Sequence, residues 1–375
     1  MSTALRVVDI TQCYSPTSGG IRTYLHAKAT WAAGAGADHA AITTGPEDAE
    51  ARLEGSRMIV VRGRTPTDRW GYRMALRPGG VLRALSDLRP HVVVVHDALA
   101  FPHSVAEWAA DHGSTVLLAC HSHLSAAVSG LPRAIRRPVG AGLGVIQRRA
   151  FRAGDVILVA SRAVRDLIAG EVNQPLRVTP LGVDVEVFAR ATPDPELRSE
   201  LAPAESALLL YAGRLSSEKR LDLLLDAFAS IPGEPVLAMA GGGAARARLE
   251  RRTRRLHIDE RVRFLGHITD RREIASLMAT ADCFVHPNPD EPFGLAPVEA
   301  ATAGCRVVAP WTIGSQEVLS RAGATLVMPG ASDALARGVR DALDRPRPPR
   351  IAPADVGWAR TFQAEWRLYE ALRRR

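Results

Sequence analysis

The sequence predicts an α/β protein made of two domains, each built around a parallel sheet. Short apolar runs rich in β-branched residues alternate with longer helical patterns throughout the 375-residue chain. The runs are continuously apolar, which is typical of parallel strands covered by helices on both faces. A chain of this length also exceeds a typical single core, so two domains are expected.

The expected strands fall into two sets, one in each half of the chain. They span residues 5–10, 57–61, 91–96, 115–120, 155–160 and 176–182 in the first half, and 207–213, 236–241, 262–267, 282–287 and 305–310 in the second. Repeated strand–helix units of this kind predict a doubly wound sheet in each half.

A charged segment punctuated by prolines, residues 186–206, separates the two sets of strands. Domain boundaries fall in segments of this composition. We therefore expect a first domain over 1–190 and a second over 191–354.

Another proline-rich break, residues 344–357, precedes an amphipathic tail that carries the aromatic residues Trp358, Phe362, Trp366 and Tyr369. The periodicity predicts a terminal helix over 355–375. Two placements are open: the helix packs on the second domain, or it crosses back and docks on the first.

The formal net charge of +8 comes almost entirely from arginine, because lysine occurs only at Lys28 and Lys219. Such a bias is typical of a GC-rich genome. No basic stripe with interleaved aromatic residues is visible, so we expect no nucleic-acid partner.

The chain starts without a signal-peptide pattern and has no apolar stretch near the ~20 residues that span a bilayer. Its four cysteines, which form no CxxC pair or metal-ligand spacing, are Cys13, Cys120, Cys283 and Cys305. Free thiols in a reducing compartment are expected. The sequence thus favours a cytoplasmic protein without a structural metal.

One basic cluster stands among apolar residues, and its members are Arg133, Arg136, Arg137, Arg148, Arg149 and Arg152. A solvated helix face is one interpretation. Contact with anionic lipid headgroups is the other, and it would place the protein at the inner face of the cell membrane.

Gly19 and Gly20 follow the first strand and precede a helical pattern that starts near Ile21. Glycines there let the backbone approach a ligand, and a helix N-terminus favours an anion. The pattern is not GxGxxG, so no nicotinamide site is expected. A plain tight turn is the alternative.

A strand of the second domain ends at Gly213, and Arg214 and Lys219 follow it, five positions apart. Two cations beside helix amide groups suit a diphosphate. An exposed loop in which Glu218 pairs with them is the alternative. Gly266 ends a later strand, where a nucleobase could lie against the backbone. We expect these elements to meet at the carboxyl ends of the parallel strands, where ligands bind in open α/β sheets.

The stretch PNPDEPFGLAPVEAATAG places Glu291 and Glu299 eight positions apart, on either side of a short apolar turn. One interpretation is a loop followed by a helix with an acid in its first turn. The other is a ligand loop, in which one carboxylate faces a sugar and the other a ribose.

Together these motifs resemble the retaining GT-B glycosyltransferases of family 4, which transfer a sugar from a nucleotide-sugar. The resemblance rests on motifs that occur in the same order as in the family and cover nearly the whole chain. They span residues 18–23, 154–168, 177–188, 211–228 and 291–304. The resemblance implies two Rossmann-like domains that face a central cleft, with the C-terminal helix crossing back to the N-domain.

The resemblance also implies roles for residues of the second domain. Arg214 and Lys219 match the pair that holds the donor diphosphate, and Glu291 matches the glutamate that faces the donor sugar. Glu299 matches the glutamate that binds the ribose hydroxyls. The turn whose backbone amides line the sugar and phosphate is matched by Phe293, Gly294 and Leu295.

In the first domain, Gly19 and Gly20 match the glycine loop near the diphosphate. His121 resembles the histidine near the reacting sugar, with His123 as a nearby competitor. Arg214, Lys219, Glu291 and His121 are thus the expected catalytic residues.

The activity implied is hexosyl transfer with retention, without cofactor or metal, because Arg214 and Lys219 would stabilise the leaving diphosphate. GDP-mannose is the favoured donor, from which mannose would be transferred, with UDP-glucose and UDP-N-acetylglucosamine as alternative donors. The expected acceptor is a saccharide, a glycolipid or another small molecule. From other classes, a sugar-nucleotide epimerase or hydrolase and a non-catalytic nucleotide-sugar binder stay open. One departure from the family is the glycine at 241–243, where many relatives have an acid.

Overall fold

The computed structural model describes residues 4–15, 19–65, 73–121 and 133–373. The chain divides into two compact units. Of the described residues, those up to 181 and those from Trp358 onward form the first unit, and Gly182–Gly357 form the second.

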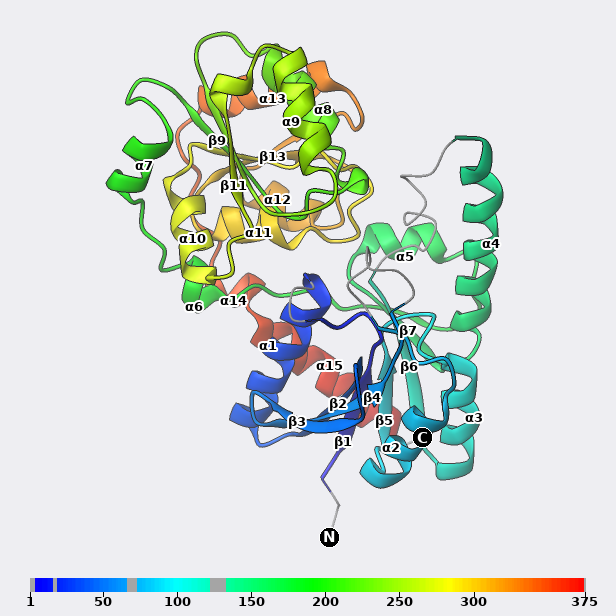
Figure 1. Cartoon of the computed structure of the whole chain (residues 1–375). Coiled ribbons are helices and arrows are strands. Elements are labelled where there is room, and N and C mark those ends of the chain that lie inside the picture. Colours follow the sequence, from blue (N-terminus) through cyan, green and yellow to red (C-terminus); the bar gives the residue numbers. More distant parts are fainter. Residues whose placement is uncertain (1–3, 16–18, 66–72, 122–132, 374–375) are drawn as a thin grey trace. The chain divides into compact units, whose positions relative to one another are not determined.

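The first unit is built on an eight-stranded sheet of order β3-β4-β2-β1-β5-β6-β7-β8 (Figure 1). All neighbours pair in parallel except β3 and β4, which form an antiparallel hairpin at one edge. The strands are β1 (Arg6–Ile10), β2 (Asp38–Gly45), β3 (Ala49–Leu53), β4 (Ser56–Arg62), β5 (Val92–Val95), β6 (Thr115–Cys120), β7 (Val156–Val159) and β8 (Leu176–Val178). The helices are α1 (Gly20–Ala35), α2 (Gly79–Leu88), α3 (Pro102–His112), α4 (Arg133–Phe151), α5 (Arg162–Ile168) and α15 (Trp358–Arg373).

The second unit has a six-stranded, all-parallel sheet of order β11-β10-β9-β12-β13-β14. Its strands are β9 (Leu208–Ala212), β10 (Val236–Ala240), β11 (Val262–Gly266), β12 (Cys283–Val285), β13 (Arg306–Pro310) and β14 (Thr325–Val327). Its longer helices are α7 (Pro195–Leu201), α8 (Leu221–Ala229), α9 (Arg246–Arg255), α10 (Arg271–Thr280), α11 (Leu295–Thr302), α12 (Gln316–Arg321) and α13 (Ser332–Leu343). The short turns are α6 (Val185–Phe188), η2 (Ser217–Lys219), η3 (Asp259–Arg261) and α14 (Pro353–Val356).

Every strand expected from the apolar runs is present, and the structure adds β2, β3 and β14. The sequence of β2, DHAAITTG, holds only one large aliphatic residue, so its burial could not be read from a continuous apolar run. The chain passes from the first unit to the second between residues 181 and 182 and returns between 357 and 358. The composition shift had placed these boundaries at 190/191 and 354/355.

Each sheet has a point where the strand order reverses, and this point positions the sites. In the first unit the chain moves from β1 to β2 on one side and later to β5 on the other. In the second unit β9 lies between β10 and β12 in the same way. Ligands of open α/β sheets bind beyond the carboxyl ends of strands at such points.

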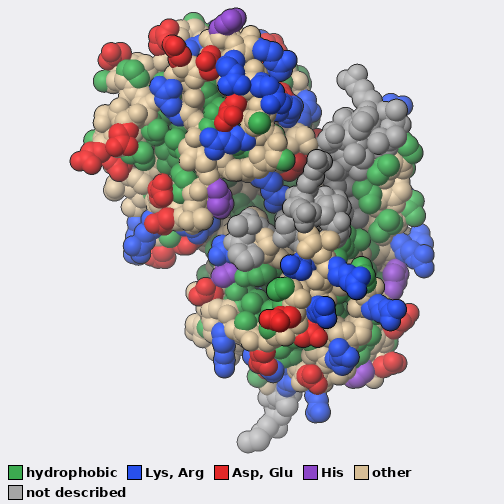
Figure 2. Space-filling view, in the orientation of Figure 1, with side chains coloured by type: hydrophobic (Ala, Val, Ile, Leu, Met, Phe, Trp, Pro, Cys, Tyr) green, Lys and Arg blue, Asp and Glu red, His purple; other side chains and the backbone are tan. Residues whose placement is uncertain are grey.

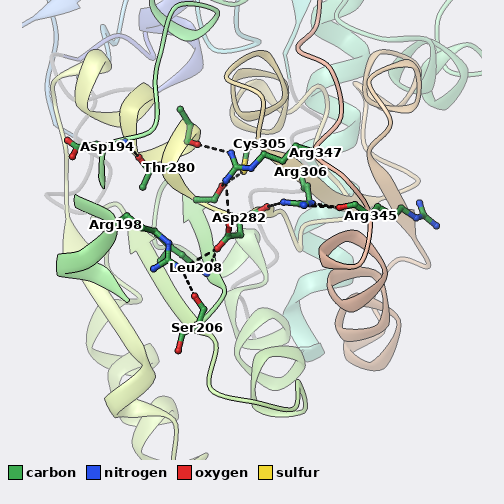
Figure 3. Close-up of polar contacts among 12 residues, drawn as sticks. Asp194, Arg198, Ser206, Leu208, Thr280, Asp282, Cys305, Arg306, Arg345 and Arg347 are labelled. Carbon is green, nitrogen blue, oxygen red and sulfur yellow. Dashed lines mark hydrogen bonds and ion pairs between the residues drawn. The ribbon is translucent and has the colours of Figure 1, made fainter. Parts of the chain in front are cut away.

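At the opposite, amino edge of the second sheet, Asp282 gathers segments that are distant in sequence (Figure 3). Its carboxylate accepts a hydrogen bond from the Leu208 amide at 2.9 Å and lies 3.6 Å from Arg198 and 3.4 Å from Arg347. Arg306 donates to the Asp282 carbonyl at 3.3 Å and to the Arg345 carbonyl at 2.7 Å. Many arginines of this chain thus tie peptide carbonyls together and have a structural role.

Candidate active site

The loops after β9 and β12 bring two of the predicted residues of the second unit together. Lys219 lies in η2, which follows β9, and Glu291 lies in the loop that follows β12. Their side chains form an ion pair with 2.7 Å between Lys219 Nζ and Glu291 Oε2. Because β9 and β12 are the two strands at the reversal point, this pair lies where the fold places a ligand.

Two further side chains surround the Glu291 carboxylate. Asn288 Nδ2 donates to Oε2 at 3.0 Å, and His286 Nε2 lies 3.5 Å from the same oxygen. Burial opposes ionisation of Glu291, but His286 and Lys219 outweigh it and hold its pKa well below the usual range. All three contacts are made to Oε2, so Oε1 is left to accept from a ligand.

Glycines allow the loops after neighbouring strands to touch. Gly213 directly follows β9 and donates from its amide to the Ala240 carbonyl at 2.9 Å. Gly241 has φ 154°, and a Cβ there would overlap the Gly213 carbonyl oxygen. The Gly241 amide donates to the carbonyl of Gly266, at the end of β11, at 2.6 Å. The carboxyl ends of three adjacent strands are therefore held close enough for a ligand to lie against backbone.

The predicted PFGL turn forms the start of α11. Gly294 has φ 88° and precedes Leu295, the first helical residue. Phe293 is buried, and its carbonyl accepts from the Ser315 amide at 2.8 Å. The turn is thus fixed by its neighbours, and the first amides of α11 lie at the carboxyl edge of the sheet.

Glu299 lies one turn further along α11, and Arg271 holds its carboxylate. Arg271 Nη2 donates to Glu299 Oε1 at 2.8 Å, and the guanidinium lies 5.0 Å from the ring centre of Phe188. Glu299 is buried apart from a small exposed fraction. The two predicted glutamates therefore have separate partners, as two different ligand groups would require.

The remaining predicted residues lie in the first unit. Gly19 and Gly20 form the N-terminus of α1, and a Cβ at Gly19 would meet no atom within 4 Å. His121 follows β6 and is partly exposed. His123 lies outside the described residues.

Sequence reasoning missed a buried polar cluster in the first unit. Asp9 of β1 accepts from Lys28 Nζ at 3.0 Å, from His39 Nε2 at 2.7 Å and from His96 Nε2 at 2.8 Å. His96 Nδ1 lies 2.7 Å from His121 Nε2. The available signal was an acid inside the apolar run of β1 and a histidine directly after β5.

The C-terminal helix α15 completes this cluster. Tyr24 Oη donates to Glu365 at 2.6 Å, and Lys28 Nζ donates to Tyr369 Oη at 3.1 Å. Burial and then Glu365 raise the pKa of both tyrosines, so they act as neutral hydroxyls. α15 thus belongs to the first unit, although the chain reaches it only after crossing the second.

Comparisons with known proteins agree with this architecture. The family model "Glycosyltransferase Family 4" matches residues 18–187, and "Glycosyl transferases group 1" matches residues 194–353. A GDP-mannose-dependent alpha-(1-6)-phosphatidylinositol dimannoside mannosyltransferase of Mycobacterium tuberculosis is 32% identical over 351 residues, which cover 91% of this chain and 88% of the relative. A glycogen synthase of the same species is 28% identical over 413 aligned positions, which cover 99% of this chain and 95% of the length of that relative.

Solved structures show the same fold. Sucrose-phosphate synthase from Thermosynechococcus elongatus superimposes with a TM-score of 0.75 at 22% identity, covering 97% of this chain and 94% of its own. Anabaena HepE in complex with UDP and glucose gives a TM-score of 0.68 at 20% identity, covering 96% and 94%.

Fold and site together define a glycosyltransferase of the GT-B class. Within that class, the chain belongs to glycosyltransferase family 4.

Proposed function

We propose that this enzyme transfers a hexose from a nucleotide-sugar to an acceptor hydroxyl with retention of configuration, and that its donor is GDP-mannose. The observation that supports this best is the largely buried Glu291 carboxylate at the reversal point of the second sheet, which accepts from Lys219 and Asn288 and lies 3.5 Å from His286. The mannose donor is supported by the mycobacterial relative, which is a GDP-mannose-dependent mannosyltransferase. UDP-glucose and UDP-N-acetylglucosamine are the competing donors.

The chemistry follows from charge. Breaking the bond between the anomeric carbon and phosphate leaves positive charge on the sugar and negative charge on the diphosphate. Lys219 and Arg214 would stabilise the leaving diphosphate, together with the first amides of α11, and they supply the positive charge that a metal supplies elsewhere.

The two glutamates would fix the donor. Glu291 Oε1 would accept from a sugar hydroxyl, while Oε2 keeps the hydrogen bonds from Lys219 and Asn288. Glu299 would accept from the ribose hydroxyls, with Arg271 holding its other side. In the first unit, Gly19 and Gly20 would receive an anionic group at the N-terminus of α1, and His121 a sugar hydroxyl.

Thermal unfolding with UDP, GDP, ADP and their sugars tests the donor. We expect the largest rise in Tm with GDP or GDP-mannose, because only the native state binds the ligand. Glu299→Gln should lose most of this rise, whereas the exposed Glu234→Gln should keep it. If none of the nucleotides raised Tm, the proposal would be refuted. A rise in Tm with UDP alone would move the donor to the competing class of UDP-sugars.

Product analysis separates transfer from the other classes of activity. A transferase forms a new glycoside only when acceptor is present, whereas a hydrolase or epimerase changes the donor without one. The anomeric configuration of the product, read by NMR, tests retention.

We further propose that α4 contacts an anionic membrane surface that carries a glycolipid acceptor. The helix exposes Val139, Val145 and Ile146, and Arg149 of the same helix is exposed as well. Figure 2 shows hydrophobic side chains on the surface of this part of the first unit, with Lys or Arg side chains beside them. Exposed apolar and cationic side chains on one helix suit an interfacial site. Among the described residues, no helix has the length and apolar character to cross a membrane.

Sedimentation with vesicles tests the contact. We expect binding to vesicles with phosphatidylglycerol and little binding to pure phosphatidylcholine. Val145→Glu combined with Ile146→Glu should weaken binding about 10-fold or more, given roughly 1.5–3 kcal/mol for each apolar side chain buried. Unchanged binding by this variant would show that α4 does not make the contact.

A further inference from the structure

A chain of three hydrogen-bonded side chains runs through the first unit from Asp9 to His121. Asp9 lies in β1, His96 directly follows β5, and His121 directly follows β6, and these three strands are neighbours in the sheet. His96 Nε2 lies 2.8 Å from Asp9 Oδ1, and His96 Nδ1 lies 2.7 Å from His121 Nε2. Asp9 and His96 are buried, so only the His121 end of this chain of side chains is partly exposed, and it lies at the carboxyl edge of the sheet.

The direction of each hydrogen bond follows from the charge on Asp9. Burial opposes its ionisation, but Lys28, His39 and His96 keep its pKa well below the usual range, so the carboxylate only accepts. His96 Nε2 therefore carries a hydrogen and donates it in the hydrogen bond to Asp9. In the neutral ring Nδ1 then holds a lone pair, and it accepts from His121 Nε2–H.

These bonds leave His121 Nδ1 as an acceptor. No described residue makes a hydrogen bond to it. Burial lowers the pKa of His121 to about 3, so the ring is neutral at physiological pH.

Packing fixes the ring as firmly as the hydrogen bonds do. The His96 and His121 rings stack with centres 5.0 Å apart and planes 8° apart. Tyr24 packs edge-on against both, at 5.1 Å and 5.7 Å between ring centres. His121 therefore cannot easily flip, which would put Cδ2 and Cε1 in the places of Nδ1 and Nε2.

We propose that Asp9 and His96 are positioning residues that hold His121 in the Nε2–H tautomer and present Nδ1 to a hydroxyl of the bound substrate. This inference rests on the proposed glycosyl transfer. A lone pair at that place accepts from a hydroxyl and repels a carboxylate or phosphate oxygen. His121 would thus select sugars that carry a hydroxyl at the position it contacts.

Two variants of His96 separate this role from a structural one. In His96→Asn, the amide oxygen can occupy the place of Nδ1 and still accept from His121, but the link to Asp9 is lost. In His96→Gln, the amide nitrogen can occupy the place of Nε2 and donate to Asp9, but nothing accepts from His121. A merely structural cluster favours the glutamine, because it keeps the buried Asp9 paired.

Nitrogen-15 NMR of histidine-labelled protein above neutral pH reads the tautomer directly, with His121→Gln used to assign the signal. We expect a protonated Nε2 and a bare Nδ1 in the wild type and in His96→Asn, and mixed tautomers in His96→Gln. The kcat of transfer should fall about 10- to 100-fold in His96→Gln, as when a partner that fixes a histidine tautomer is removed, and should fall less in His96→Asn.

A proton on Nδ1 of wild-type His121 would overturn the inference, as would a His96→Gln variant more active than His96→Asn. A wild type that shows the expected tautomer but transfers no sugar would support the arrangement. That result would instead overturn the proposed function.

Discussion

At the scale of single residues, one largely buried carboxylate is central to the chemistry proposed for the second unit. Glu291 stays ionised in a largely buried place because Lys219 lies 2.7 Å away and Asn288 donates to the same oxygen. An unpaired carboxylate in such a place would take up a proton. The lysine is therefore expected to act on both the charge of Glu291 and the leaving diphosphate.

Replacing Lys219 by methionine should show both effects. The loss of a cation from the diphosphate site should lower kcat about 100- to 1000-fold. Without its ion pair the pKa of Glu291 should rise, because burial remains while the opposing charge is gone. As the pH is lowered, Glu291 of the variant would take up a proton at a higher pH than in the wild type. Activity that requires ionised Glu291 would therefore be lost at a higher pH.

The pH profile of kcat/KM measures this shift of the acid limb. Glu291→Gln is the control, because it has no carboxyl to titrate and should lack this limb. An acid limb at the same pH in wild type and Lys219→Met would show that Glu291 does not titrate in the profile.

At the scale of elements, the loops at the carboxyl edge depend on backbone contacts that admit no side chain. Gly241→Ala should destabilise the second unit by about 3 kcal/mol or more, since its Cβ would overlap the Gly213 carbonyl and its φ of 154° disfavours alanine. The neighbouring Gly242→Ala is the matched control, because its Cβ would meet only His267 Cβ at 3.6 Å. Urea unfolding measures both, and equal stabilities would contradict the contact.

The same scale shows what the sequence can predict. Strands that are continuous apolar runs, such as β5 and β9, were predicted within about one residue at each end. β2 and β14 were missed, because β2 is rich in alanine and threonine and β14 has three residues.

The candidate site divides in a similar way. Residues within one motif, such as Glu291 and Glu299, were predicted from spacing and resemblance. The partners Arg271 and His286 were not, because a hydrogen bond between elements depends on the fold. His96 was overlooked for the same reason: its contacts to Asp9 and His121 span 87 and 25 positions of sequence.

At the scale of the whole molecule, the chain leaves the first unit, builds the second and returns. The return is secured by α15, whose Glu365 receives a hydrogen bond from Tyr24, 341 positions earlier. Glu365 also lies 3.5 Å from Lys28 Nζ and accepts from Tyr369. The last helix therefore supplies part of the charge balance for a lysine buried near the start of the chain.

Glu365→Gln should destabilise the first unit by about 3–5 kcal/mol, because breaking a buried ionic group leaves Lys28 with less compensation. Glu370→Gln, on the exposed face of the same helix, should change stability by less than about 0.5 kcal/mol. Hydrogen exchange locates the effect: in Glu365→Gln, the amides of α1, β1 and α15 should exchange faster, while those of β9 and β12 keep their wild-type rates. Equal protection of α1 in the two variants would mean that α15 is held by its aromatic packing alone, through contacts such as Trp31 with Phe362 at 5.9 Å between ring centres.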